Sequence, residues 1–421
     1  MCGEFRGVVC RSARFSFNSL LAVTDTPRWR KAVTLAAAAF DDGGVTNLAT
    51  TAYDLGYAQT ANYVQGLRES RLARQATSDL VAYYGYTAVN NLGDDACLTG
   101  ARELFPSRTV LDWRRISDHA PAALRGTPRA RAVQLGGGTL IGSLGFADGF
   151  RRAARELGAP TFALGTGVES VIAEQWGMTS DEAVAQWREI LHDMTYLAVR
   201  GPQSAATLRE LYGIDAPVCG DIALGISTPP PTPREKHLGM CLAAPADGVW
   251  ESSVKKMFEA NLDLARSLLR DGWTLQLFIF WPMHDRAITR KLVHALGDGD
   301  RVRVTAPSTP ADFFRVARTC SVFVGTRLHS AVFASMLDIP TVALAYRPKA
   351  DDFMASIGRT DWSLRADGIS GERLRDAVER LSAEREQHAG QIHEAVGNLQ
   401  LALRTHVAAA DAALQSSHRA P

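Results

Sequence analysis

The 421-residue sequence lacks several features that would place it in a common class. Its six cysteines are scattered, with no C-x-x-C pair and no histidine–cysteine cluster of zinc-site spacing, so the sequence predicts no metal site and favours a reducing compartment. The N-terminus has no apolar core of signal-peptide length, and no stretch reaches about 18 uninterrupted apolar residues. We therefore expect a cytoplasmic protein with no transmembrane segment.

The chain also has almost no net charge and few lysines. The 46 basic and 45 acidic residues leave a formal net charge of +1. No broad field attracts nucleic acid or an anionic membrane, so we expect no nucleic-acid partner. Only six of the basic residues are lysines, so a single arginine says little about function, whereas Lys349 stands out.

Several catalytic motifs are missing as well. The sequence contains no G-x-S-x-G, H-E-x-x-H or G-x-x-x-x-G-K-[ST] motif, and nothing points to covalent serine or cysteine chemistry. The dinucleotide fingerprint G-x-G-x-x-G is absent from the first strand-to-helix turn, which makes a redox function a poor interpretation.

What the chain does have is two series of apolar strands alternating with helices of about 10–15 residues, a pattern typical of βαβ units and parallel sheets. Four prolines within residues 227–233 interrupt the alternation, and proline fits neither a helix interior nor a central strand. A further helix is expected to begin at Thr26 and Pro27. The expected segments are an N-terminal extension of unknown role (1–75), a Rossmann-like domain (76–227), a proline-rich linker (228–237), a second Rossmann-like domain (238–368) and a helical tail (369–421).

These series predict an α/β protein in which two Rossmann-like domains face each other across a cleft. Ligands of such sheets bind at the carboxyl ends of the strands, so the residues that follow each strand are the candidates for a site. In the first half these are Asn91, Gly93, Asp94, the glycines of 136–138 and 165–167, and Arg200. In the second half they are Asp285, Arg327, His329 and Lys349. The glycines allow close backbone approach to a ligand, or they form ordinary tight turns.

The segment VFVGTRLHSAVFASML places Arg327 and His329 between an apolar strand and an apolar helix. A helix N-terminus attracts anions, and arginine adds a planar, bidentate grip for carboxylate or phosphate. His329 next to such an anion is a candidate proton donor. The alternative is a histidine that caps the helix or packs in the core.

Asp94 and Arg200 each have two interpretations. Asp94 opens the helix in NNLGDDACLTG, where it is either the helix N-cap or a carboxylate that holds or deprotonates a hydroxyl group. Arg200 follows the strand TYLAV and is either an anion ligand or an ordinary surface arginine.

In order along the chain, NLGDDA, LGGGTLIG, ALGTG, VRGPQSAATLRELYGI, CGDIAL and GTRLHSAVFASMLDIPTVALAYRPK resemble the polysaccharide pyruvyltransferases. The resemblance spans residues 78 to about 365 and implies a GT-B-like fold. It implies transfer of pyruvyl from phosphoenolpyruvate to a sugar or lipid-linked saccharide, without a metal or redox cofactor. A lipid-linked acceptor would bring the protein to a membrane surface.

The resemblance also implies roles for single residues. His329 would protonate the methylene carbon of the donor, while Asp94 would orient or deprotonate a sugar hydroxyl. The donor would contact Arg200, Arg327, Lys349, Gly137 and Gly138, and the acceptor would contact Asn91, Gly93 and Asp285. Two alternatives are a GT-B glycosyltransferase that uses a nucleotide sugar and a non-catalytic protein that binds sugars or anions.

Overall fold

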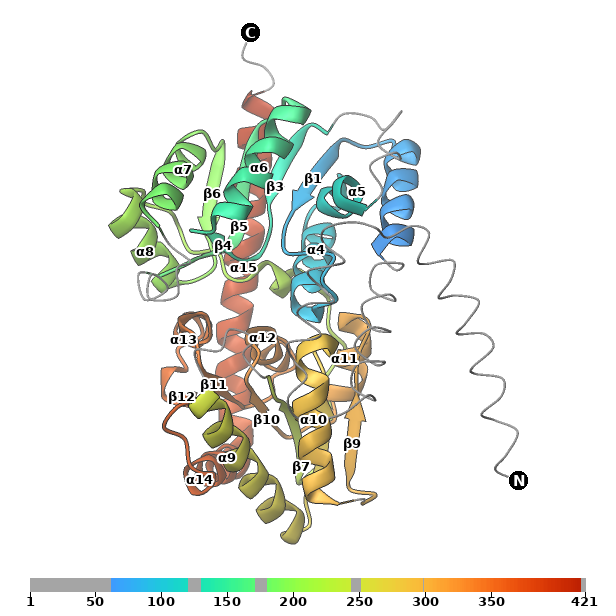
Figure 1. Cartoon of the computed structure of the whole chain (residues 1–421), viewed down its shortest axis with the longest axis vertical. Helices are drawn as coiled ribbons and strands as arrows, with labels where there is room; N and C mark the ends of the chain where they lie inside the picture. Colours follow the sequence, from blue (N-terminus) through green and yellow to red (C-terminus); the bar gives the residue numbers. More distant parts are fainter. Residues whose placement is uncertain (1–61, 120–129, 171–179, 244–250, 298, 418–421) are drawn as a thin grey trace, which may run out of the picture. The chain divides into compact units, whose positions relative to one another are not determined.

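The computed structural model of the chain describes residues 62–119, 130–170, 180–243, 251–297 and 299–417 (Figure 1). The helix expected to begin at Thr26 lies outside these residues. Of the expected N-terminal extension, the structure describes a helix over residues 62–75. Residues 65–421 form one compact unit that contains both sheets.

The first lobe, residues 80–225, is built on a six-stranded parallel sheet (Figure 1). Its strands follow the order β2-β1-β3-β5-β4, and β6 also pairs with β5. The strands are β1 (Leu80–Tyr84), β2 (Thr109–Asp112), β3 (Ala132–Leu135), β4 (Gly138–Ile141), β5 (Thr161–Val168) and β6 (Tyr196–Val199). The helices are α4 (Leu92–Leu104), α5 (Trp113–His119), α6 (Leu144–Leu157), α7 (Asp181–His192), α8 (Pro202–Tyr212) and the short η3 (Ile222–Gly225).

The second lobe, residues 237–365, contains another six-stranded parallel sheet, in the order β12-β11-β10-β7-β8-β9. Its strands are β7 (His237–Cys241), β8 (Thr274–Phe278), β9 (Val302–Thr305), β10 (Val322–Gly325), β11 (Thr341–Ala345) and β12 (Ser363–Arg365). Its helices are α9 (Glu251–Arg270), α10 (Pro282–Leu296), α11 (Pro310–Ala317), α12 (Leu328–Ser335), α13 (Pro348–Ser356) and the short η4 (Thr360–Trp362). The predicted fold class, two parallel-sheet α/β domains followed by a helical tail, is confirmed.

The tail consists of α14 (Gly371–Ala383) and α15 (Arg385–Ser417), the latter red in Figure 1. Helix α15 contacts α12 and α14 and also reaches β5, β6 and η3 of the first lobe. Two polar contacts fix it there, from Arg108 Nε to Asp411 Oδ1 at 2.6 Å and between Tyr196 Oη and His406 Nδ1 at 2.7 Å. The chain therefore crosses between the lobes a second time. Among the helices of the described ranges, none is both long and apolar enough to cross a bilayer.

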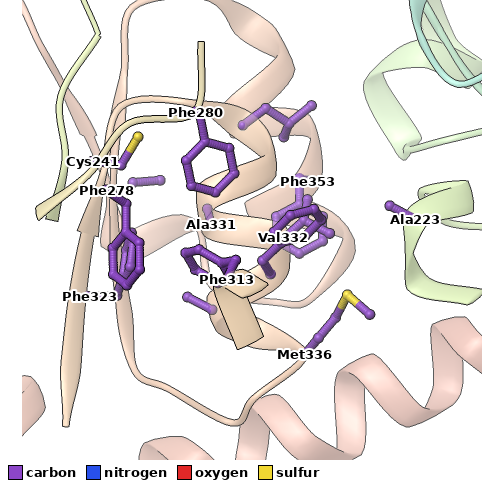
Figure 2. Packing of buried hydrophobic residues seen from close by; sticks show 14 of the residues in the cluster. Ala223, Cys241, Phe278, Phe280, Phe313, Phe323, Ala331, Val332, Met336 and Phe353 are labelled. Atoms are coloured by element: carbon purple, nitrogen blue, oxygen red, sulfur yellow. The ribbon is translucent and has the colours of Figure 1, made fainter. Parts of the chain in front are cut away.

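The core of the second lobe explains why α12 stands where it does. All eight residues of α12 are buried, as expected for a helix that is apolar on every side. Figure 2 shows Ala331 and Val332 of this helix among the rings of Phe280, Phe313 and Phe353. This packing fixes the N-terminal end of α12, where Arg327 and His329 are found.

Two glycine segments differ from the prediction. The residues after Gly136–Gly137 form a separate strand, β4, and Gly165–Thr166–Gly167 lie within β5 rather than in a loop. A bulge accounts for the second case, because the pairing of β5 with β6 shifts register between Leu164 and Thr166, and Gly165 has a φ of +68°. A β-carbon at this glycine would lie 2.7 Å from the backbone nitrogen of Ile222.

Candidate active site

The carboxyl ends of both sheets line a cavity of about 480 Å³. Most of the site residues predicted from the sequence line this cavity, namely Asn91, Asp94, Gly138, Arg200, Arg327, His329 and Lys349. Gly93, Gly137 and Asp285 lie behind its wall. The cavity also contains aromatic side chains and two further acids, Glu169 and Asp352, that the sequence had not nominated.

His329 stands at the second position of α12, and 7% of the residue's surface is exposed. Its Nε2 lies 3.5 Å from Asp221 Oδ2 and 3.4 Å from Cys97 Sγ. The ring rests on the backbone of Gly93, where any β-carbon would collide with it. Gly93 therefore makes room for the imidazole, and Nδ1 is the ring nitrogen that neither Asp221 nor Cys97 engages.

Asp221 is the partner that sequence reasoning missed. Its side chain is fully buried and accepts a hydrogen bond from the Ala223 backbone N–H at 2.9 Å. Burial alone would raise the pKa of this carboxyl, but His329, Arg200 and the accepted hydrogen bonds outweigh that effect and lower it. The carboxylate therefore stays ionised beside the imidazole and can stabilise its protonated form. His329 is thus neither the helix cap nor an apolar core residue.

Asp94 faces the cavity, whereas its neighbour turns away. The N-cap of α4 is Asn91, whose side chain accepts from the Gly93 N–H at 3.2 Å, so Asp94 is not the cap. Asp95 instead pairs with Arg115 at 2.9 Å. Burial raises the pKa of Asp94 to about 6, and the charges of His329 and Lys349 limit this rise. Such a carboxylate is mostly ionised at neutral pH and is basic enough to accept a proton.

Arg200 is a buried cation rather than a surface residue, with 2% of its surface exposed. Its Nη2 donates to Thr139 Oγ1 at 3.3 Å, and its Nη1 lies 3.9 Å from Asp221 Oδ2. Nε and Nη1 have no hydrogen-bond acceptor within the described part of the chain. Because buried N–H groups are rarely left unpaired, this guanidinium at the cavity wall indicates an anionic ligand.

Arg327 is held from behind by Asp285. The Arg327 Nε donates to Asp285 Oδ1 at 3.2 Å, and Nη2 contacts the same carboxylate oxygen at 2.5 Å. Asp285 is fully buried and its Oδ2 also accepts from the Trp281 backbone N–H at 2.9 Å. The structure therefore places Asp285 as a positioning residue for Arg327, not at the acceptor contact expected from the sequence.

Gly137 also has a different place from the one expected. Its N–H donates to Tyr83 Oη at 3.0 Å, and a β-carbon there would come within 2.6 Å of Cys97 Sγ. Gly137 is therefore required by packing under the cavity wall. Gly138, with φ +96°, does line the cavity, and a β-carbon there would lie 3.4 Å from Asp94 Oδ1.

The cavity wall carries both cations and aromatic side chains. Arg347 and Lys349, at the start of α13, lie near Glu169. Burial raises the pKa of the Glu169 carboxyl, and the charges of Arg347, Lys349 and Arg200 oppose this rise. Tyr86 packs against Phe146, with ring centroids 5.6 Å apart, and against Trp281 at 6.3 Å. The Arg327 guanidinium lies over Trp281, 5.2 Å from the ring centroid. Aromatic faces of this kind pack well against the C–H face of a sugar ring.

Asp352 lines the cavity and joins the two lobes. This second-lobe residue is 2% exposed, and its carboxylate accepts from the Gln203 N–H at 2.8 Å and from Ser204 Oγ at 2.7 Å. Helix α8 has Gly201 as its N-cap and no side-chain cap of its own. Asp352 thus caps a helix of the other lobe.

Comparison with known proteins gives a family but no close relative. The family described as polysaccharide pyruvyl transferase matches residues 80–348, more than half of the chain. No curated protein matches the sequence. Similar solved structures include the O-GlcNAc transferase of Thermobaculum terrenum, at 14% identity and TM-score 0.43, with 81% of this chain and 69% of that chain covered. Another is the UDP-GlcNAc 2-epimerase of Neisseria meningitidis, at 11% identity and TM-score 0.49, with 81% and 100% covered.

Proposed function

Because the chain belongs to the polysaccharide pyruvyl transferase family, we propose that it transfers pyruvyl from phosphoenolpyruvate to two hydroxyls of one sugar. The product is a cyclic pyruvate ketal, and inorganic phosphate is released. The observation that carries this proposal is the buried, incompletely paired Arg200 in a cavity that also holds His329 and Asp94.

The donor has a phosphate and a carboxylate, and the cations that line the cavity suit both. Arg200 offers Nε and Nη1, and Arg327, Lys349 and Arg347 line the same cavity. Hydrogen bonds from charged groups to such anions are each worth about 1.5–3 kcal/mol. Because Asp285 fixes the guanidinium of Arg327, that contact costs little further ordering when the donor binds.

In the first step, protonated His329 gives its proton to the methylene carbon of the donor, which becomes a methyl group. The first sugar hydroxyl adds to the neighbouring carbon and gives its proton to Asp94. Asp221 holds the imidazole through Nε2 and stabilises its charged form before transfer. One general acid of this kind ordinarily accelerates a reaction about 10²–10⁴-fold.

In the second step, the second hydroxyl of the same sugar attacks that carbon and phosphate leaves. The proton of this hydroxyl restores His329, and the proton on Asp94 passes to the departing phosphate. Over both steps one hydroxyl proton ends on the methyl group and the other on phosphate. The sugar ring would lie along Tyr86, Phe146 and Trp281 with its diol toward Asp94.

A panel of neutral glycosides incubated with phosphoenolpyruvate tests the proposal by mass spectrometry. We expect a mass gain of one pyruvic acid less one water in at least one glycoside, together with equimolar phosphate. Parallel reactions with nucleotide sugars serve as the comparison. Glycosyl transfer and nucleotide release, with no ketal from any acceptor, would contradict the proposed function.

A further inference from the structure

Behind the catalytic imidazole, three side chains with metal-binding atoms converge. They are Cys97 of α4, Asp221 before η3 and His329 of α12, so both lobes contribute. Cys97 Sγ lies 3.4 Å from His329 Nε2 and 3.9 Å from Asp221 Oδ1, and His329 Nε2 lies 3.5 Å from Asp221 Oδ2. Cys97 and Asp221 are fully buried.

These separations suit a tetrahedral cation. Zinc binds cysteine sulfur at about 2.3 Å and histidine nitrogen or carboxylate oxygen at about 2.0–2.2 Å. Tetrahedral angles then place ligand atoms roughly 3.3–3.6 Å apart. The observed spacings of 3.4 Å and 3.5 Å at Nε2 fall in this range, and the three ligand atoms all lie within 4.8 Å of one another.

The Asp221 carboxylate has one oxygen that could bind a cation. Asp221 Oδ1 is engaged by the Ala223 N–H, but Oδ2 is buried with no hydrogen-bond donor within the described residues. His329 Nε2 lies 3.5 Å from this oxygen, and Arg200 Nη1 lies 3.9 Å from it. A buried, underused carboxylate oxygen beside a thiol and an imidazole nitrogen is a second reason to infer a ligand here.

We propose that Cys97, Asp221 and His329 form a three-ligand site for a thiophilic divalent cation such as Zn²⁺, and that its occupancy switches the enzyme off. The effect on turnover rests on the proposed function, whereas binding itself does not. A cation on Nε2 replaces the Nε2 proton of the imidazolium and uses the Asp221 charge that stabilises that form. The imidazole that remains is a much weaker proton donor at Nδ1. Because the ligands come from both lobes, the cation also ties the lobes together.

Arg200 sets the strength of such a site. Its positive charge lies close to Asp221 and opposes the binding of a second cation there. Cys97, Asp221 and His329 supply only three of the four ligands of a tetrahedral cation. The site therefore differs from a four-ligand structural zinc site and is suited to reversible occupancy.

Cobalt provides a probe that does not depend on catalysis. Co²⁺ titrated into the wild-type protein should give the visible bands of a tetrahedral ion and a thiolate-to-cobalt charge-transfer band, and added Zn²⁺ should abolish both. The charge-transfer band should be lost in Cys97→Ala. It should be retained in the matched control Cys320→Ala, a buried thiol in the second lobe.

The result that overturns the proposal is an unchanged charge-transfer band in Cys97→Ala, or no tetrahedral spectrum in the wild-type protein. If Cys97→Ala fails to fold, Asp221→Asn is the second variant, and its cobalt affinity should fall at least tenfold. Zinc inhibition that a chelator reverses would support the regulatory part. Because the spectrum needs no turnover, failure of the cobalt test is distinct from failure to form a ketal.

Discussion

Replacing Asp94 by asparagine should stabilise the protein in a pH-dependent way. The residue is 9% exposed, and burial raises the pKa of its carboxyl from 3.8 to about 6. At about 1.36 kcal/mol per unit, this shift corresponds to about 3 kcal/mol of folding free energy that the ionised form costs. The folded state binds this proton more tightly than the unfolded chain does. The contribution of Asp94 to wild-type stability is therefore greatest below pH 3.8 and declines as pH rises through about 6.

Asparagine does not titrate, so the free energies of unfolding of the two proteins should diverge over that window. Urea denaturation at several pH values between about 4 and 8 measures the difference. We expect Asp94→Asn to gain up to about 3 kcal/mol relative to wild type above pH 6, while losing ketal formation. The control is Asp148→Asn, on the exposed face of α6, which should show no such divergence. A constant difference between Asp94→Asn and wild type at all pH values would refute the buried, cavity-facing position of this carboxylate.

Three further predictions concern binding and the contacts that position the site. Arg200→Ala should weaken phosphoenolpyruvate binding about 10- to 100-fold, because it removes charge-assisted hydrogen bonds to the anion. Calorimetry measures this affinity, and an unchanged value would contradict the role of Arg200. Asp285→Ala should lower the free energy of unfolding by about 3–5 kcal/mol, because it leaves buried Arg327 unpaired. Its control, Asp367→Ala, removes an exposed partner of Arg365 and should cost about 0–1 kcal/mol, so equal losses by urea denaturation would contradict the argument. Asp352→Ala should cost about 0.5–2 kcal/mol through the lost cap of α8, and Asp352→Asn should retain part of it; no change in thermal or urea unfolding would argue against the cap.

Local patterns were enough to predict the segment around β10 and α12. An apolar strand, a glycine and an apolar helix imply a strand-to-helix turn at the cavity edge, and Arg327 and His329 stand there. The alternation of strands and helices likewise gave both parallel sheets. These features depend on neighbours along the chain, which is the information that a sequence displays directly.

The partners of these residues could not be predicted in the same way. His329 meets Cys97, 232 positions away, and Asp352 meets Ser204, 148 positions away. Asp221 lies in CGDIAL, a motif that the sequence did display, but nothing local shows that its carboxylate turns toward His329. The residues around Asp285 in the sequence likewise gave no sign that its carboxylate would be buried against Arg327.

The glycines show a second limit of local reasoning. A Gly-Thr-Gly sequence after an apolar run is typical of a loop, yet Gly165 and Gly167 continue β5 through a bulge. The deciding contacts are with Ile222 and Arg200, which approach too closely for a side chain. Gly137 and Gly93 are glycines for the same packing reason.

The central claim is that His329 is the proton donor in a cavity whose cations bind the donor anion. The most direct test is one pair of measurements on His329→Gln, namely phosphoenolpyruvate affinity by calorimetry and the rate of ketal formation with an accepted glycoside. We expect affinity within a few-fold of wild type and a rate about 10²–10⁴-fold lower. Ketal formation at the wild-type rate in this variant would contradict the account.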